Sequence, residues 1–453
     1  MPKGVMIAAP HSGSGKTTVS MGLMGVLSKR YRVKPYKVGP DYIDPSYHRY
    51  ITGTPSTNLD IFMLGENTLK FLYARNTDRY DISLIESVMG LYDGVGTTAY
   101  GSSAHVAKLL NLPVILVIDA GAMAASVSAL VSGYVNYDKR VNIAGVIFNK
   151  VGSEKHFHLL KECVERDTGL KVLGYLPMDK AIELPSRHLG LVPASEMVGL
   201  NASFARLNEL IERYIDIDGI LKIAEQAGSV SYQAPEKIVP LRNKVPVAVA
   251  MDEAFNFYYS DGLELLEQLG GELIPFSPIR DDKIPDGVKG LYLGGGFPEI
   301  FAKELSENNS MKSSIKDAVR EGMPVYAECG GLMYLTRSLK DLAGCTYDMV
   351  GIFEVGSEMT RRLQRFGYVQ AEALRDNILM TKGEIVKGHE FHHSTLKGYN
   401  EDSACYEVSK PDKSAIWKEG LLYRNCLATY VHTHFWSNPG MAKRFLLMCE
   451  EMW

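Results

Sequence analysis

Near the start of the chain lies a run of residues suited to holding phosphates: Gly13, Ser14, Gly15, Lys16, Thr17 and Thr18. Glycines let backbone N–H groups close around phosphate oxygens, and a helix that starts there directs the positive end of its dipole at the same anion. By this pattern Lys16 contacts the outer phosphates and the Thr17 hydroxyl holds Mg²⁺. The usual pattern has a further glycine where this chain has Pro10. An apolar run, Val5 to Ala9, and a helical pattern, Val19 to Leu27, nevertheless give the loop the strand-to-helix setting of a nucleotide site.

A second group of residues, in the C-terminal half, suits nucleophilic catalysis. An apolar segment that begins at Met323 leads to Cys329, which is followed by two glycines and a helical pattern. Small neighbours permit the strained turn of a nucleophile elbow, which exposes a thiol at a helix N-terminus. We expect the helix dipole to lower the pKa of the Cys329 thiol, and the N–H of Gly330 to help bind an oxyanion. A glycine run that includes Gly295 is expected to supply the second donor.

A thiol nucleophile also needs a base, and two histidines, His432 and His434, follow a β-like stretch near the C-terminus. The remaining cysteines are interpreted as small buried hydrophobes: Cys163, Cys345, Cys405, Cys426 and Cys449. None of the six belongs to a C-x-x-C pair, a usage that fits a reducing cytosol better than a secreted scaffold. The first residues run straight into the phosphate-loop strand, which leaves no room for a signal peptide. We therefore expect a cytoplasmic protein.

Composition narrows the range of partners. The chain has 453 residues, of which 46% are hydrophobic and 23% charged, as in an ordinary globular protein. A formal net charge of −4 provides no general attraction to nucleic acid or to an anionic membrane. The longest apolar region, Leu112 to Val135, is interrupted by Asp119 and by small polar residues, so it predicts a buried strand and a helix, not a membrane span.

The order of apolar and helical patterns predicts an α/β fold with two domains. Short β-rich runs alternate with helical patterns up to about residue 195, which indicates a mostly parallel sheet. Residues 196–244 are expected to form connecting helices and then a linker rich in Ser, Gln and Pro. A new alternation begins at Val245, and residues 245–453 are predicted to form a second α/β domain with a β-rich end.

The segments GGGFPE, AECGGL and YVHTHF resemble the class I glutamine amidotransferase domain in its cobyric-acid-synthase-type branch. In that family a cysteine attacks the side-chain amide of glutamine, which releases ammonia and leaves a glutamyl thioester for water to hydrolyse. The resemblance implies that Cys329 is the nucleophile and that His432 activates it, while the expected oxyanion donors stay Gly295 and Gly330. Many class I members carry a glutamate two residues after the histidine, where this chain has His434. This departure favours a Cys-His dyad, and leaves His434 as a catalytic, core or substrate-facing residue.

The N-terminal half resembles the dethiobiotin-synthetase-like P-loop ATPases through the phosphate loop and the segments YKVGPDYIDP and ESVMGLYDG. Taken together, the two halves are similar to the cobyrinate a,c-diamide synthase family along nearly the whole chain. By this resemblance ATP phosphorylates a peripheral acetate of a tetrapyrrole polycarboxylate, and ammonia from L-glutamine converts the a and c acetates into amides in turn. The cofactors implied are ATP and Mg²⁺. Cobyrinate, in cobalamin biosynthesis, is the substrate that these segments favour.

The resemblance also assigns roles to single residues of the N-terminal half. Lys16 and Lys37 would contact phosphates, and Thr17 and Glu86 would hold Mg²⁺. Asn149 would read adenine, although asparagine is also a common turn residue. The residues expected beside the acyl phosphate are Asp41, Tyr42 and Asp44.

Several alternatives stay open at the level of the sequence. The same reaction on nickel-sirohydrochlorin, in coenzyme F430 biosynthesis, belongs to a close relative, and cobyric acid synthases amidate other side chains. A different class of protein, a P-loop nucleotide switch with an inactive amidotransferase domain, is an alternative hypothesis. The intact elbow at Cys329 argues against it. The segment His389 to Ser394 holds three histidines that suit either a substrate contact or a metal, and the basic run Arg361 to Arg365 suits either a carboxylate clamp or solvent. A homodimer is also left open.

Overall fold

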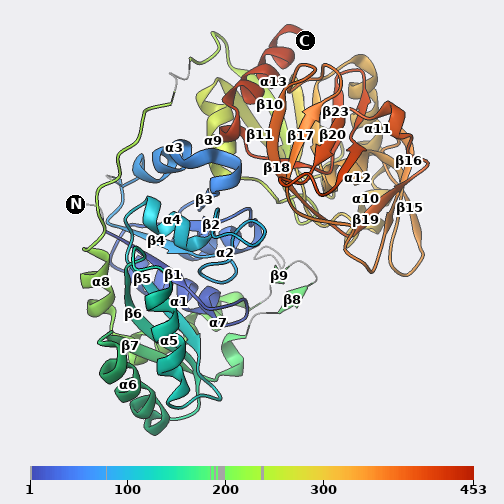
Figure 1. The fold of residues 1–453 in the computed structure, drawn as a ribbon. Coiled ribbons are helices and arrows are strands. Elements are labelled where there is room, and N and C mark those ends of the chain that lie inside the picture. Colours follow the sequence, from blue (N-terminus) through green and yellow to red (C-terminus); the bar gives the residue numbers. More distant parts are fainter. Residues whose placement is uncertain are drawn as a thin grey trace. The chain divides into compact units, whose positions relative to one another are not determined.

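The computed structural model describes residues 3–77, 79–183, 185–187, 190–191, 199–235 and 239–452. The chain divides into two compact units, Met1–Pro235 and Glu236–Trp453, called here the N-terminal and the C-terminal unit. Each unit has a central sheet with a buried core, and both are α/β (Figure 1). The expected α/β class is therefore confirmed.

Seven parallel strands form the sheet of the N-terminal unit, in the order β3-β2-β4-β1-β5-β6-β7. The strands are β1 (Gly4–Ala8), β2 (Val33–Val38), β3 (Thr57–Leu59), β4 (Ile82–Glu86), β5 (Val114–Asp119), β6 (Ile143–Val151) and β7 (Val172–Pro177). Strands β1, β4 and β5 are almost wholly buried, as expected for a parallel sheet covered by helices. Their carboxyl ends therefore meet at one edge of the sheet, the edge where ligands bind in such folds.

Helices connect these strands: α1 (Lys16–Ser28), α2 (Ile43–Thr52), α3 (Ile61–Ala74), α4 (Ser103–Leu109), α5 (Ser126–Tyr137), α6 (Glu154–Thr168), α7 (Leu200–Tyr214) and α8 (Ile217–Ala224). Helix α7 packs on α1, and α8 packs on β1 and β7, so both belong to the N-terminal unit (Figure 1). The close approach of α7 to α1 explains why position 22 in α1 is a glycine. A Cβ at Gly22 would lie 2.6 Å from the Ile211 side chain, so only glycine lets α7 come this near. A short 3-10 helix, η1 (Lys180–Ile182), and a short hairpin, β8 (Ser186–Arg187) with β9 (Gly190–Leu191), also belong to this unit.

The C-terminal unit has a six-stranded sheet in the order β11-β10-β12-β13-β23-β22, parallel except for the edge strand β22. Its strands are β10 (Val245–Ala250), β11 (Gly271–Phe276), β12 (Gly290–Leu293), β13 (Val325–Glu328), β22 (Leu421–Tyr423) and β23 (Cys426–Thr429). The helices of the unit are α9 (Ser260–Gln268), α10 (Ala302–Glu307), α11 (Asn309–Glu321), α12 (Gly330–Leu335) and α13 (Pro439–Met452). Because β13 and β23 are adjacent and parallel, the residues that follow them meet at the same edge.

The β-rich end of the chain forms two further sheets. One has the order β15-β14-β16-β19, with β14 (Thr336–Lys340), β15 (Thr346–Asp348), β16 (Phe353–Met359) and β19 (Ser394–Lys397). The other is antiparallel, in the order β21-β20-β17-β18-β24, with β17 (Arg365–Ala373), β18 (Ile385–His392), β20 (Tyr406–Ser409), β21 (Ile416–Glu419) and β24 (His432–Thr433). Its edge strand β24 pairs with β18 and carries His432, one of the predicted site histidines.

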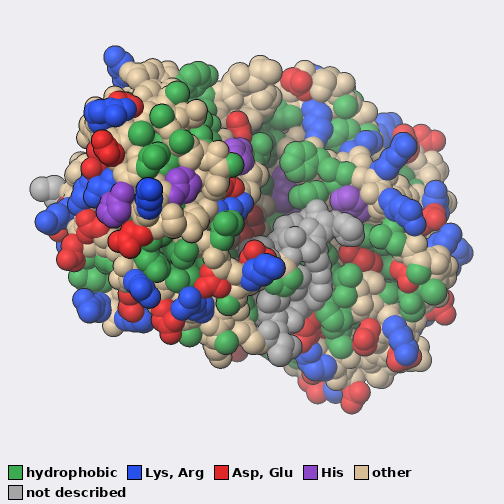
Figure 2. All heavy atoms as spheres, turned by 90° about the horizontal axis from the view of Figure 1, so that it is seen from below, with side chains coloured by type: hydrophobic (Ala, Val, Ile, Leu, Met, Phe, Trp, Pro, Cys, Tyr) green, Lys and Arg blue, Asp and Glu red, His purple; other side chains and the backbone are tan. Residues whose placement is uncertain are grey.

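The surface mixes charges of both signs. On the face drawn in Figure 2, lysines and arginines are interspersed with aspartates and glutamates. Among the helices described, none is long and apolar enough to cross a membrane.

Candidate active sites

The phosphate loop joins the end of β1 to the first turn of α1. Gly13 and Gly15 have φ angles of 85° and 95°, in the left-handed region that favours glycine. The Asn149 amide at the end of β6 donates to the Ser14 carbonyl at 3.0 Å. A Cβ at Gly15 would lie 1.9 Å from the same amide nitrogen. Asn149 thus supports the loop from the end of β6, two strands away from β1, a contact that the sequence did not predict.

Two lysines converge beside this loop. Lys16 begins α1 and Lys37 lies in β2, and both are buried. Burial and the neighbouring Lys37 ammonium lower the pKa of Lys16. Burial also works against the charge of Lys37, but Asp44 and Glu86 hold its pKa above the ordinary range. A polyphosphate would compensate two ammonium groups so placed, because it supplies charge of the opposite sign.

Glu86, at the end of β4, is the centre of a buried polar network. Its Oε1 accepts from the Thr17 hydroxyl at 2.6 Å and from Lys37 Nζ at 2.9 Å. Its Oε2 lies 2.8 Å from Nε2 of His48, whose Nδ1 lies 3.1 Å from the Ser56 hydroxyl. Burial opposes ionisation of Glu86, yet Lys37 and the bonds from His48 and Thr17 keep its pKa well below the ordinary value. Sequence reasoning missed His48, since only its position on α2 brings it to Glu86.

The segment after β2 brings its carboxylates to the same network. Asp44 accepts from Lys37 Nζ at 2.6 Å, and burial and the Asp41 charge raise the pKa of Asp44. Asp41 Oδ1 accepts from the backbone N–H groups of Ile43 and Asp44, at 2.8 and 3.0 Å, and so holds the start of α2. Tyr42, between them, is half-buried at the N-cap of that helix.

The predicted elbow in the C-terminal unit has a strained backbone. Cys329 lies between β13 and α12 with φ 46° and ψ −94°, a conformation that costs energy in a residue other than glycine. Its N–H donates to the Thr429 carbonyl of β23 at 2.8 Å, which fixes the turn against the neighbouring strand. Strain of this kind, held by surrounding structure, is typical of a nucleophile elbow.

The expected lowering of the Cys329 pKa is wrong. Burial raises the pKa of the thiol, and the carboxylates of Glu299, Glu328 and Glu390 add to the rise. Cys329 is only 8% exposed, and α12 is six residues long, so solvation and helix dipole offer little compensation. A base is therefore needed to remove the proton when the thiol attacks.

The glycine run lies between the elbow and His432. A Cβ at Gly295 would lie 2.6 Å from Cε1 of the His432 ring. A Cβ at Gly330 would lie 3.0 Å from the Gly296 nitrogen and 3.4 Å from the Gly295 carbonyl carbon. These contacts bring the predicted oxyanion residues, the elbow and the histidine into one cluster.

The two histidines of the YVHTH segment have different surroundings. His432, on β24, is buried, and its ring stacks on His389 of β18 with centroids 5.0 Å apart. His434 is fully buried, stacks on Tyr259, and has Nε2 3.3 Å from the Asp261 carboxylate. Its Nδ1 accepts from the Trp436 N–H at 3.1 Å. These partners make His434 part of the core beneath the site.

The histidines of β18 are held apart by the pleat of the sheet. His389 Nε2 lies 2.8 Å from the Tyr259 hydroxyl, whereas His392 stacks on Tyr430 with centroids 3.9 Å apart. Within the part of the chain that the structure describes, no group of three or more His, Cys, Asp or Glu residues is placed to hold a metal ion.

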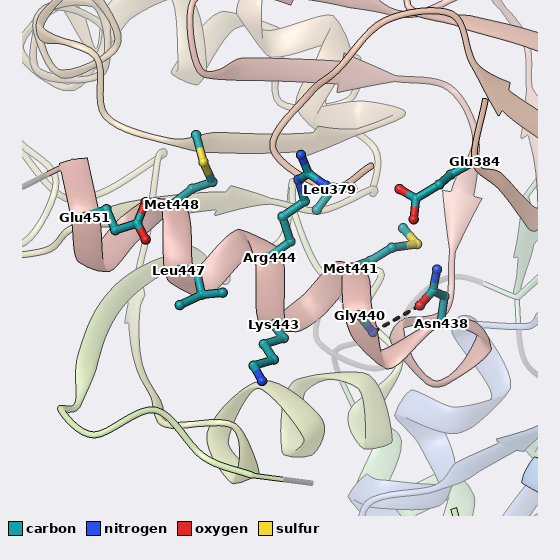
Figure 3. Close-up of a pocket in the computed structure, with 10 residues that line it drawn as sticks. All are labelled: Leu379, Glu384, Asn438, Gly440, Met441, Lys443, Arg444, Leu447, Met448 and Glu451. Atoms are coloured by element: carbon teal, nitrogen blue, oxygen red, sulfur yellow. Dashed lines mark hydrogen bonds between the residues drawn. The ribbon is translucent and has the colours of Figure 1, made fainter. Parts of the chain in front are cut away.

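A cavity of about 410 Å³ lies along α13, outside these clusters. Figure 3 shows its lining from α13 and nearby segments, with the Gly440 N–H donating to Asn438 Oδ1 at 3.0 Å. None of the predicted site residues lines it.

Comparisons with known proteins agree with this arrangement. Residues 5–192 match the family model of the CobQ/CobB/MinD/ParA nucleotide binding domain, and residues 246–440 match that of the CobB/CobQ-like glutamine amidotransferase domain. The chain is 55% identical to a cobyrinate a,c-diamide synthase of Caldanaerobacter subterraneus subsp. tengcongensis, with 98% of each chain covered. It is 46% identical to the enzyme of that name from Listeria innocua, over 96% of this chain and 97% of the relative. With two domain matches and relatives that span nearly its full length, the chain belongs to the cobyrinate a,c-diamide synthase family.

Proposed function

We propose that this chain amidates the a and c acetate carboxylates of cobyrinate, with ATP as activator and L-glutamine as nitrogen donor. A carboxylate is a poor electrophile, so its oxygen first attacks the γ-phosphorus of ATP to give an acyl phosphate and ADP. Ammonia then attacks the acyl carbon, and phosphate leaves as the amide forms. The observation that carries the proposal is one chain with both a phosphate loop backed by Lys37 and Glu86 and a strained cysteine elbow.

The N-terminal unit would perform the activation. The phosphates would be bound by Lys37 and by the loop residues Gly13, Ser14, Gly15, Lys16, Thr17 and Thr18. Asn149 would contact adenine as well as the Ser14 carbonyl. Asp41, Tyr42 and Asp44, which follow β2, would orient the acetate beside the γ-phosphate. The short contacts of Lys37 with Asp44 and Glu86 support one shared site for both reactants.

The residues present fit Mg²⁺. The Thr17 hydroxyl and Glu86 Oε1 lie 2.6 Å apart and are hard oxygen donors of the kind this ion prefers. Thr17 and Glu86 would hold the ion together with ATP oxygens, and the ion would neutralise charge on the phosphates.

The C-terminal unit would supply ammonia. His432 takes the proton of Cys329, whose sulfur attacks the glutamine amide carbon. The N–H groups at Gly295 and Gly330 would stabilise the oxyanion. His432 then protonates the leaving nitrogen, ammonia departs, and water hydrolyses the glutamyl thioester to glutamate. The raised pKa of Cys329 supports a histidine acting as general base.

Two variants test this division of labour. Cys329→Ala should abolish glutamine-dependent synthesis and keep synthesis from added ammonium salts, because only the ammonia supply is lost. Lys16→Ala should lose synthesis from both nitrogen sources, because acyl phosphate formation fails. Both are read by chromatography of the tetrapyrrole product. If Cys329→Ala also lost ammonia-dependent synthesis while keeping its unfolding midpoint, the assigned role of the cysteine would be wrong.

A further inference from the structure

The group that orients His432 does not come from the position two residues after it, because His434 there is committed to Asp261 and Trp436. An imidazole acting as a base needs an acidic partner on its other nitrogen, which fixes the ring and stabilises the imidazolium. The ion pair recorded for His432 is with Glu328: Nδ1 lies 3.8 Å from Oε2.

Hydrogen bonds hold the Glu328 carboxylate in a fixed position. It is the last residue of β13, immediately before Cys329, and it is 1% exposed. Its Oε1 accepts from the Tyr326 hydroxyl and, at 3.1 Å, from the Thr433 N–H. Its Oε2 accepts from the Tyr292 hydroxyl at 3.2 Å. Donors to both oxygens suit an ionised carboxylate, and they leave Oε2 facing the histidine with capacity for another donor.

The neighbours of His432 strengthen this assignment. Three titratable side chains that interact with His432 are Glu328 on β13 and His389 and His392 on β18. Burial and the charge of His432 lower the pKa of His389, and burial lowers that of His392 to about 3, so both are neutral at neutral pH. Of these three side chains, Glu328 is the one whose carboxylate can balance a positive charge on His432.

We infer that Glu328 is the positioning residue of the glutaminase site, which orients His432 and stabilises its protonated form. The inference rests on the proposed function of the elbow. At 3.8 Å the pair is longer than a hydrogen bond, and catalytic hydrogen bonds commonly shorten when substrate binds. Because Glu328 and Cys329 share a peptide bond, one turn of the chain fixes both the nucleophile and the group that orients its base.

Glu328→Gln tests the inference, because it keeps the size of the side chain and removes its charge. We expect the glutaminase kcat to fall roughly a hundredfold or more, with the KM for glutamine changed less than about threefold. The acid limb of the glutaminase pH profile should move to lower pH, since an imidazolium without a neighbouring carboxylate releases its proton more readily. Ammonia-dependent amidation of cobyrinate should be unchanged.

The matched control is Asp261→Asn, which neutralises the acid beside the other histidine, His434. It should leave the glutaminase pH profile where it is. Glu328→Asp keeps the charge but shortens the side chain, so its kcat should lie between those of the wild type and Glu328→Gln. If Glu328→Gln does not fold, the kcat and pH profile of Glu328→Asp carry the test, with at least a tenfold loss of kcat expected.

Two results would overturn the inference. One is a Glu328→Gln glutaminase kcat within about threefold of the wild type. The other is an equal loss of glutaminase and ammonia-dependent activity with a lowered unfolding midpoint, which is the signature of a purely structural role. Failure of the proposed function looks different, because then the wild-type protein itself would lack glutaminase activity.

Discussion

At the scale of single residues, burial decides how the nucleophile works. The raised pKa of Cys329 means that its thiol is protonated at neutral pH, so the thiolate forms only as the proton passes to a base. The strained backbone at φ 46° keeps the sulfur at the strand end while the core excludes water from it. In the proposed mechanism, Cys329 would therefore react only when substrate and His432 act together.

This state of the thiol predicts the pH dependence of alkylation. In the protein without glutamine, the rate of Cys329 modification by iodoacetamide should be low at pH 7 and still rising above about pH 9, because the thiolate fraction grows up to the raised pKa. Mass spectrometry of the Cys329 peptide measures the rate. Cys345, which was expected to be buried, is exposed and serves as an internal reference that reacts faster at neutral pH. A rate that is already level by about pH 7.5 would indicate a preformed thiolate and contradict the prediction.

At the scale of elements, strand β18 pairs with β24 at the candidate site and carries buried histidines. These histidines make the stability of the C-terminal unit depend on pH. His389 and His392 are buried, and burial keeps the pKa of His392 at about 3. A histidine in the unfolded chain takes up a proton below about pH 6.5, whereas His392 in the folded protein stays neutral there. Stability should therefore be lost as the pH falls from about 6.5 toward 3, by about 2 kcal/mol between pH 7 and pH 5 for this histidine alone.

His392→Phe tests this contribution and keeps a ring on Tyr430. The change in unfolding free energy between pH 7 and pH 5 should be about 2 kcal/mol smaller in the variant than in the wild type. All three tryptophans, Trp417, Trp436 and Trp453, lie in the C-terminal half, so tryptophan fluorescence during urea unfolding follows that unit. His158→Gln, at an exposed position of α6, is the control. An unchanged pH dependence in His392→Phe would show that the buried histidine does not set it.

The elements themselves were largely predictable, and the exceptions have physical reasons. The short β-rich runs of the N-terminal half correspond to β1, β4, β5, β6 and β7, because parallel strands buried on both faces are continuously apolar. These runs are Gly4 to Ala9, Ile82 to Glu86, Val114 to Asp119, Ile143 to Asn149 and Val172 to Leu176. Strand β2 was not among them, since Lys34, Pro35 and Lys37 interrupt its apolar pattern. Those lysines are buried because Pro55, Asp44 and Glu86 accept their hydrogen bonds, and two of these partners, Pro55 and Glu86, lie 21 and 49 residues away in the sequence.

At the scale of the whole molecule, two chemical centres follow from two short motifs, but their supporting partners do not. The phosphate loop and the elbow were visible in the sequence because each is a short motif of adjacent residues. The first runs from Gly13 to Thr18, and the second is Cys329 with the two glycines that follow it. The contacts of His48 with Glu86 and of Glu328 with His432 became visible only in the folded structure, because the partners lie far apart in the sequence. The departure at His434 favoured a Cys-His dyad, and only the fold shows that the Glu328 carboxylate lies 3.8 Å from His432.

The central claim, that one chain couples ATP and glutamine to amidation of a tetrapyrrole, is tested most directly by mass spectrometry of the product. The purified protein is incubated with ATP, Mg²⁺ and glutamine, with cobyrinate in one tube and nickel-sirohydrochlorin in another. The account predicts that two carboxylates of cobyrinate become amides, one after the other, only when ATP is present. An unchanged mass in both tubes while ATP is still hydrolysed would contradict it, and amidation of nickel-sirohydrochlorin alone would reassign the substrate.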